Sequence, residues 1–191
     1  LARSYHLIMI RLAALSFFFL SPLALNGAPP ERLVIGAEAK KGIAIVDPSD
    51  GNKVLWHHPG RQVHFLHLLP NQTLLTQNGW TDLVEYDLEK NLVWSYDAST
   101  QNREDGVPKV EVHAAQRHPD GTTMIAESGA SRIIEVTPEG EVKKAFPLAV
   151  ASSNAHSDTR QVHKLENGHY LVAHEVEQIV KEYDAVGTVV R

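Results

Sequence analysis

Cysteine is missing from all 191 residues of the sequence. No disulfide can form, and a lipid-modified cleavage site, which needs a cysteine, is excluded. The folded part must therefore be stabilised by its own core, which suits a periplasmic or secreted protein of the bacterial type.

Clusters of positive charge are also scarce. Lys and Arg number 18 against 23 Asp and Glu, a net charge of −5, and removal of residues 1–28 with Arg3 and Arg11 would lower it to −7. The pairs Lys40-Lys41 and Lys143-Lys144 stand alone. Because phosphate binding needs clustered basic side chains, we predict no nucleic-acid partner.

Several chemical motifs are absent as well. No His-x-His or His-Glu-x-x-His pattern occurs, and the adjacent His57 and His58 would point to opposite faces of a strand. Serine nucleophile motifs, phosphate-binding glycine loops and paired catalytic carboxylates are missing too. Imidazoles and carboxylates are present in numbers that suit a metal, but without a close ligand pair we predict no metal site.

Long hydrophobic runs are confined to the N-terminus. Arg11 precedes an apolar run from Leu12 to Leu20, and small residues at Ala24 and Ala28 follow, which is the layout of a secretory signal peptide over residues 1–28. The run is short for a bilayer span, although a membrane anchor is the alternative. We expect translation to begin at Met9, with residues 1–8 as upstream read-through. The mature protein should be periplasmic or secreted, without a stable membrane span.

A repeated pattern fills the rest of the sequence. Residues 112–146 contain four short runs of alternating or β-branched residues separated by turn signals, which is typical of a four-stranded antiparallel meander. Similar series occupy 63–96 and 160–191, and a weaker one occupies 33–56. The last turns of the copies fall at Gly51, Lys90, Gly140 and Gly187. Since a propeller blade repeats about every 40 to 50 residues, we predict an all-β propeller of four-stranded antiparallel blades.

The copies predict an incomplete propeller of about four blades over residues 31–191. The first copy has only three strands and lacks the innermost one, and Arg191 falls within the expected last strand of the fourth copy. A closed propeller takes at least four blades. We therefore expect the sequence to be a fragment.

The repeat also predicts a shared site at one mouth of the channel. Six residues before the first turn of three successive blades stand His64, His113 and Arg160. The first strand of each blade lines the channel, so these side chains should converge. They are the candidates for catalytic residues.

Hairpin pairing extends this set. If each first turn is a tight hairpin, His113 lies opposite Ser128 and next to Glu127, and Arg160 lies opposite Glu175 and next to His174. The loop before the fourth copy adds His156 and Asp158. The predicted ligand-binding residues are His64, Asn78, His113, Glu127, His156, Arg160 and His174, with Glu175 as the alternative to the last. Such a cluster could bind an anionic ligand or transfer protons, or its histidines could serve only as structural hydrogen-bond partners.

Two segments resemble the repeats of quinoprotein-like propellers: DPSDGNKVLW at 47–56 and DLEKNLVW at 87–94. Those enzymes hold pyrroloquinoline quinone and calcium in the channel. The docking tryptophan of that repeat is replaced by Lys144 and Arg191 in the later copies, and the vicinal cysteines of many such enzymes cannot exist here. We therefore predict no cofactor and do not expect pyrroloquinoline quinone to bind.

HPDGTTMIAESGASRIIEV at 118–136 and ENGHYLVAHEVEQIVKEYD at 166–184 resemble instead blades of arylsulfotransferase-type and NHL-type propellers. The resemblance to exported arylsulfotransferases implies a channel histidine that is transiently sulfated, with His, Asn and Arg side chains around it. The matching residue types here are His64, His113, His156, Asn78 and Arg160, but no diagnostic catalytic motif aligns with them. Three functions stay open: binding of a small anionic or polyhydroxylated ligand, sulfuryl transfer, and a non-catalytic interaction scaffold.

Overall fold

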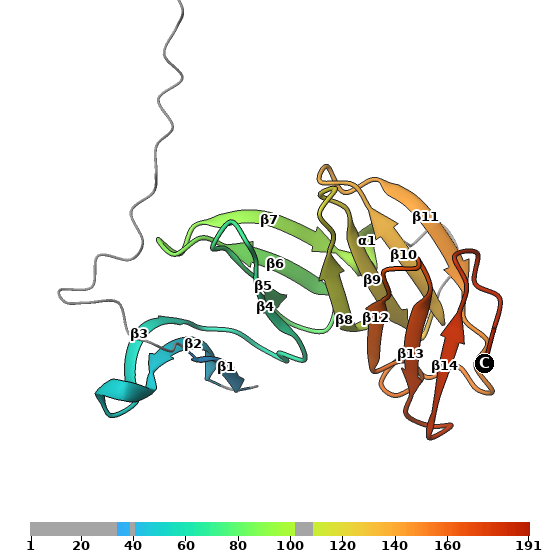
Figure 1. Ribbon diagram of the computed structural model, residues 1–191, viewed down its shortest axis with the longest axis horizontal. Helices are drawn as coiled ribbons and strands as arrows, with labels where there is room; N and C mark the ends of the chain where they lie inside the picture. Colours follow the sequence, from blue (N-terminus) through green and yellow to red (C-terminus); the bar gives the residue numbers. More distant parts are fainter. Residues whose placement is uncertain (1–33, 39–40, 102–108) are drawn as a thin grey trace, which may run out of the picture. The chain divides into compact units, whose positions relative to one another are not determined.

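The chain forms four antiparallel sheets that follow one another in sequence order (Figure 1). The computed structural model describes residues 34–38, 41–101 and 109–191, so the predicted signal peptide and Met9 lie outside the described residues. Within each sheet, neighbours along the chain are hydrogen-bonded neighbours in space. Each sheet is therefore a meander, as the repeats predicted, and we call the four sheets blades one to four.

Blade one has three strands, β1 (Val34–Glu38), β2 (Gly42–Asp47) and β3 (Lys53–His58), with a 3-10 turn, η1 (Pro48–Asp50), between the last two. Blade two contains β4 (Leu66–Leu68), β5 (Leu74–Gln77), β6 (Asp82–Tyr86) and β7 (Leu92–Asp97), and a single helical turn, α1 (Ala98–Gln101), follows it. Blade three contains β8 (Glu111–Arg117), β9 (Thr123–Ser128), β10 (Arg132–Val136) and β11 (Val142–Pro147). Blade four has β12 (Gln161–Lys164), β13 (Tyr170–His174) and β14 (Ile179–Tyr183).

The turn that precedes the last strand of blades one to three has the same backbone conformation as the turn that follows β14 in blade four. Gly51, Lys90, Gly140 and Gly187 have φ values of 61°, 71°, 87° and 89°. This left-handed conformation is easy for glycine, and Lys90 is the one residue of the four with a side chain. The four positions that set the repeat length in the sequence are thus structurally equivalent.

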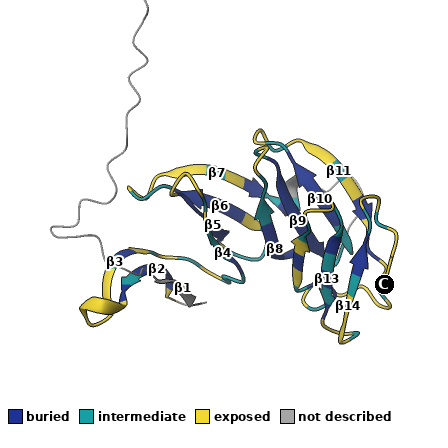
Figure 2. Cartoon of the chain, in the orientation of Figure 1, coloured by how far each residue is buried: buried dark blue, intermediate teal, exposed yellow. Residues whose placement is uncertain are grey.

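Apolar layers lie between successive blades. Ile43 and Trp56 of blade one pack with Leu74 of blade two, and corresponding clusters join blade two to three and blade three to four. Figure 2 shows buried residues concentrated in the inner strands, whereas β7 and β11 are largely exposed. The blades are therefore held together by side-chain packing between their faces.

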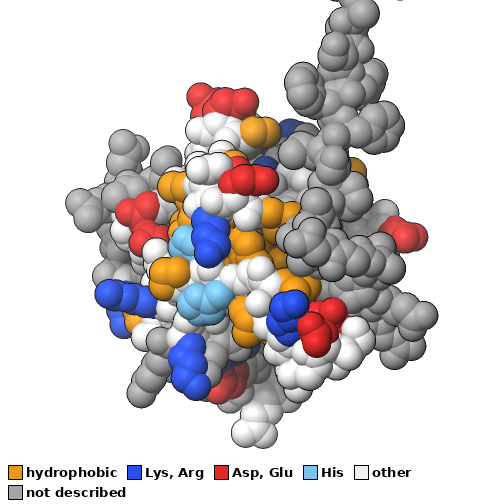
Figure 3. Space-filling model, turned by 90° about the vertical axis from the view of Figure 1, so that its left-hand side faces the viewer, with side chains coloured by type: hydrophobic (Ala, Val, Ile, Leu, Met, Phe, Trp, Pro, Cys, Tyr) orange, Lys and Arg blue, Asp and Glu red, His pale blue; other side chains and the backbone are white. Residues whose placement is uncertain are grey.

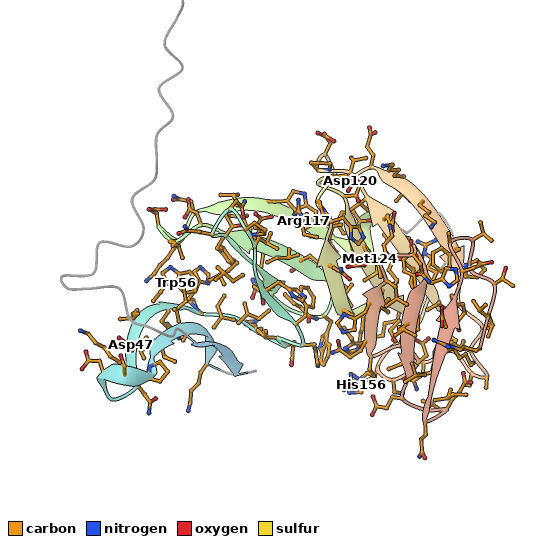
Figure 4. The ribbon with its side chains drawn as sticks, in the orientation of Figure 1. Asp47, Trp56, Arg117, Asp120, Met124 and His156 are labelled. Carbon is orange, nitrogen blue, oxygen red and sulfur yellow. The ribbon has the colours of Figure 1, made fainter. Side chains whose placement is uncertain are left out.

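A tryptophan on the last strand joins each of the first two blades to the next. The Trp56 Nε1 donates to the Leu88 carbonyl in blade two, at 2.9 Å, and the Trp94 Nε1 donates to the Pro138 carbonyl in blade three, at 2.8 Å. Figure 4 shows Trp56 pointing from blade one toward blade two. At the equivalent position of blade three, Lys144 binds the Tyr170 hydroxyl of blade four instead, at 3.0 Å.

Among the described residues, no helix is long and apolar enough to cross a membrane. On the face shown in Figure 3, hydrophobic side chains lie among interspersed acidic, basic and histidine side chains.

Candidate functional site

The three residues that the repeat predicted for one mouth lie in contact. The rings of His64 and His113 meet edge to face, with 4.7 Å between their centroids. Nη1 of Arg160 lies 3.2 Å from Nδ1 of His113. Blades two, three and four each contribute one member, as their equivalent positions in the repeat predict.

The site lies at the end of the blades opposite the first turn. Figure 4 shows His156 at one end and Asp120, in the first turn of blade three, at the other. The ring of His156 lies 5.7 Å from that of His113, centroid to centroid. The loop before blade four thus adds a third imidazole to the cluster.

The conformation of that loop is fixed by a buried carboxylate. Asp158 is 2 % exposed and accepts hydrogen bonds from the Ser128 hydroxyl at 2.5 Å, the Gly129 amide at 2.9 Å and the Ser131 hydroxyl at 2.9 Å. Its Oδ2 also accepts from the Asn154 amide within the loop, at 3.2 Å. Asp158 therefore positions the loop that carries His156 and does not itself face the cluster.

Glu111 is the carboxylate of the site. Its Oε2 lies 3.0 Å from Nδ1 of His156 and 3.5 Å from Nε2 of His113, and its Oε1 pairs with the Lys109 ammonium at 2.7 Å. Glu111 and His113 stand two residues apart on β8, and a break in the strand pairing lies between Val112 and Ala114. The hairpin pairing predicted from the sequence placed Glu127 in this role.

The difference arises from a β-bulge. The hairpin of blade three pairs Ala114 with Ala126, and without a bulge this register would place Glu127 opposite His113. The register shifts between Val112 and Ala114, so Glu127 pairs with Val112 and Ser128 pairs with Glu111. A bulge adds one unpaired residue to a strand, here His113. Glu127 forms an ion pair with Arg132 of the neighbouring strand β10.

Trp80 forms an aromatic wall of the site. His64 stacks on its ring at 5.3 Å, and His156 meets it edge to face at 5.3 Å, centroid to centroid. Gln77 accepts from the His64 backbone amide at 3.2 Å and donates to the Val112 carbonyl of blade three at 2.7 Å. Gln77 therefore fixes the start of the inner strand of blade two against blade three.

The imidazoles of His64 and His113 are held neutral. Burial, with the nearby Arg160 charge, lowers the pKa of His113 to about 4, and burial likewise lowers the pKa of His64. Burial raises the pKa of Glu111, but hydrogen bonds from Lys109 and His156 outweigh it and leave that pKa below its usual value. At neutral pH the site therefore combines the neutral imidazoles of His64 and His113 with the ionised carboxylate of Glu111.

Both cations of the site already have partners. Nε of Arg160 lies 2.6 Å from Oε2 of Glu175, and Nη1 of Arg160 donates to the His156 carbonyl at 2.9 Å. Lys109 is paired with Glu111 as described. The charges of these two pairs balance.

The remaining predicted residues lie apart from the cluster. His174 is 1 % exposed, and its two ring nitrogens bond to the Asp158 carbonyl and the Tyr183 hydroxyl, both at 2.9 Å. The side chain of Asn78 is exposed, and no hydrogen bond joins it to the cluster within the described residues. Of the two alternatives offered by the sequence, Glu175 forms the ion pair with Arg160.

A cavity of about 390 Å³ extends from His64 along the inner strands β4, β8 and β12. Its lining includes His67, Gln116 and His163, which stand three residues before the first turns of their blades. Through His64 the histidine cluster is therefore continuous with an inner surface that combines polar and apolar side chains.

Sequence reasoning missed Glu111, Lys109, Trp80 and Gln77. The spacing of Glu111 and His113 was the available signal, because residues i and i+2 of a strand share a face. Trp80 follows the end of β5 in a loop, where no periodic pattern gives its direction.

No family model and no curated protein matches the sequence. Solved structures match it with low identity. A protein of unknown function from Bacteroides caccae is 22% identical with a TM-score of 0.69, over 85% of this chain and 57% of that chain. A streptogramin B lyase structure is 11% identical with a TM-score of 0.58, over 82% of this chain and 49% of that chain.

The WD40 propeller domain of Doa1 is 16% identical with a TM-score of 0.58, over 80% of this chain and 46% of that domain. The chain thus spans about half the length of the structures that it matches. At these identities the comparisons bear on the fold alone. Together with the antiparallel sheets they confirm the all-β propeller fold.

Proposed function

We propose that this chain belongs to a propeller protein that binds a small ligand, polyhydroxylated or anionic, at the histidine cluster. The observation that carries the proposal is the direct contact of His64, His113 and Arg160, which three blades place at equivalent positions. One of these side chains alone could be a structural hydrogen-bond partner. Three together, beside a half-buried indole and next to a cavity, resemble the few convergent polar groups of a ligand site.

The charge balance favours a polyhydroxylated ligand over an anion. Arg160 and Lys109 are already paired with Glu175 and Glu111, so an anion would have to displace a carboxylate. Hydroxyl groups can both donate to Glu111 and pair with neutral imidazoles. The apolar face of a sugar ring could pack against Trp80, since an aromatic ring offers a large apolar surface.

The test is ligand binding by the full chain after treatment with EDTA. The probes are neutral mono- and disaccharides, with glucuronate and inorganic sulfate as anions, measured by calorimetry and tryptophan fluorescence. We expect at least one saccharide to bind, and His64→Ala and Trp80→Ala to weaken binding at least about tenfold. His57→Ala, at an exposed site on β3, is the matched control. If no probe binds, or if the site variants bind as the wild type does, a scaffold function is favoured.

Sulfuryl transfer is the second candidate, and one observation selects His64 for it. Nδ1 of His64 lies 3.4 Å from the Gln77 Oε1, and no charged side chain is hydrogen-bonded to this ring within the described residues. In this scheme Nε2 attacks the sulfur of an aryl sulfate, the bond from sulfur to the aryl oxygen breaks, and the phenolate leaves. A phenol acceptor then takes the sulfuryl group from the nitrogen. His113 is less suited, because Arg160 occupies its Nδ1.

An assay with p-nitrophenyl sulfate and phenol tests this candidate. Transfer predicts nitrophenol release that depends on phenol, forms phenyl sulfate and is lost in His64→Ala. No release, or release without turnover of the acceptor, excludes it.

We also propose that the protein is exported to the periplasm or the cell exterior. The support is the signal-peptide layout of residues 1–28 and the absence of cysteine. Cell fractionation of the full chain with an epitope tag tests it.

A further inference from the structure

We propose that Glu111, His113 and His156 form a binding site for a divalent transition-metal ion such as Zn²⁺. The sequence carries no familiar metal motif here, since His156 comes from a loop more than forty residues after His113. The site goes beyond the proposed function, because an ion can bind without any organic ligand.

The spacing of the three ligand atoms fits a metal. Oε2 of Glu111 lies 3.0 Å from Nδ1 of His156 and 3.5 Å from Nε2 of His113, and all three atoms lie within 4.8 Å of one another. Tetrahedral Zn²⁺ with bonds of about 2.0 to 2.2 Å places its ligand atoms about 3.3 Å apart. The trio therefore needs only small shifts to surround an ion.

The chemistry of the donors fits as well. Two imidazoles and one carboxylate are a common ligand set for zinc and for non-haem iron, and they leave further positions for water or a ligand. Glu111 and His113 are 2 % and 0 % exposed, so two of the ligands are held rigidly, whereas the exposed His156 can adjust. Lys109 occupies only Oε1 of Glu111, which leaves Oε2 directed at the imidazoles.

Metal binding requires both imidazoles to exchange tautomers. His156 donates from Nδ1 to Glu111, and no hydrogen bond engages its Nε2 within the described residues, so its proton can move there. His113 is more restricted. Arginine can only donate, so the contact from Arg160 makes Nδ1 of His113 an acceptor and places the proton on Nε2, which faces the Ala155 carbonyl at 3.2 Å.

Arg160 therefore competes with the ion for His113. For Nε2 to bind metal, the proton must move to Nδ1, and Arg160 must release that atom. Glu175 and the His156 carbonyl remain as partners for the released guanidinium. A glutamine at position 160 could instead accept a hydrogen bond from Nδ1, the arrangement that usually supports a metal-bound histidine.

The test is binding of Zn²⁺ and Co²⁺ to the EDTA-stripped full chain without organic ligand, by calorimetry and by the visible absorption of bound Co²⁺. We expect the wild type to bind one ion.

His156→Ala and Glu111→Gln should weaken ion binding at least about tenfold, and Arg160→Gln should strengthen it by on the order of tenfold. His57→Ala removes an exposed histidine elsewhere and should change nothing. His156 is exposed, so its variant should fold even if Glu111→Gln does not, and circular dichroism checks this.

Two results overturn the proposal: no ion bound by the wild type, or binding that survives both His156→Ala and Glu111→Gln. Unchanged affinity in Arg160→Gln overturns the competition with Arg160. The saccharide test uses EDTA-treated protein, and the ion test uses no saccharide. A negative result in one test therefore does not affect the interpretation of the other.

Discussion

Arg117 of blade three donates a hydrogen bond to Glu85 of blade two, with 2.8 Å between Nη2 and Oε2. The next interface repeats this pair, since Lys164 of blade four lies 2.5 Å from Glu135 of blade three. In each case the carboxylate is on the third strand of one blade, and the cation stands two residues before the first turn of the next. The corresponding residues between blades one and two are Ile45 and Leu68, so the first interface has no such pair.

We expect Arg117→Met to lower the free energy of unfolding by about 3 to 5 kcal/mol, because it leaves Glu85 buried without a counter-charge. The double variant Glu85→Ile with Arg117→Leu copies the residues of the first interface and should recover most of the loss. Urea unfolding followed by circular dichroism measures both.

The matched control is Lys143→Met, which breaks the exposed pair of Lys143 and Asp120. An exposed pair is worth less than about 1 kcal/mol. If Arg117→Met costs no more than this control, the pair of Glu85 and Arg117 does not stabilise the interface.

Trp56 should be more sensitive to substitution than Trp80. Trp56 is 5 % exposed and donates to the Leu88 carbonyl, so Trp56→Phe should cost about 1 to 3 kcal/mol through the unpaired carbonyl. Trp56→Ala should cost about 3 to 5 kcal/mol. Trp80→Phe is the control, because no hydrogen bond engages its indole nitrogen within the described residues. Equal melting temperatures for Trp56→Phe and Trp80→Phe would contradict the docking role of Trp56.

The fold could be predicted because the sequence repeats the same pattern of strands and turns in each blade. The last turn of each blade contains Gly51, Lys90, Gly140 or Gly187, and the left-handed backbone at all four makes the positions equivalent. Because the pattern recurs, an error in the predicted position of one strand does not change the predicted fold. The same repetition predicts the contact of the three site residues, because each occupies the same position in its own blade.

The details of the site depend on features that do not repeat. The bulge at His113 shifts the hairpin register and selects Glu111 over Glu127, and nothing in the spacing of polar and apolar residues marks it. Asp158 and His174 looked like site residues by position, but their partners come from loops and strands distant in sequence. The hydrogen-bond partners that separate these two side chains from the histidine cluster follow from the three-dimensional arrangement and not from the sequence pattern.

Asp158→Asn should disturb the site, although Asp158 does not itself face the histidine cluster. The carboxylate accepts hydrogen bonds from Ser128, Gly129, Ser131 and the loop amide of Asn154, whereas an amide oxygen accepts less strongly and the amide nitrogen cannot accept. Charge-assisted bonds contribute about 1.5 to 3 kcal/mol each, so we expect a loss of at least about 2 kcal/mol in the free energy of unfolding.

The same variant should weaken Zn²⁺ binding, because the loop carries His156. Asp50→Asn, at an exposed carboxylate of blade one, controls for the loss of a charge. Wild-type stability and Zn²⁺ affinity in Asp158→Asn would show that the loop is held by other contacts.

His174 should make the stability of the protein depend on pH. Burial lowers its pKa below the value of 6.5 expected in the unfolded chain, so the unfolded state binds the proton more tightly than the folded state does. The contribution of the neutral ring is therefore fully present above pH 6.5 and is lost as the pH falls below it.

Melting temperatures measured from about pH 8 to about pH 5 should fall less steeply for His174→Gln than for the wild type. Glutamine does not titrate, and it can still bond to the Asp158 carbonyl and the Tyr183 hydroxyl. Other buried histidines also add to the wild-type slope, so the decisive quantity is the difference between the two curves. His57→Gln removes an exposed histidine and should keep the wild-type slope. Parallel curves for the wild type and His174→Gln would show that protonation of His174 does not limit stability in this range.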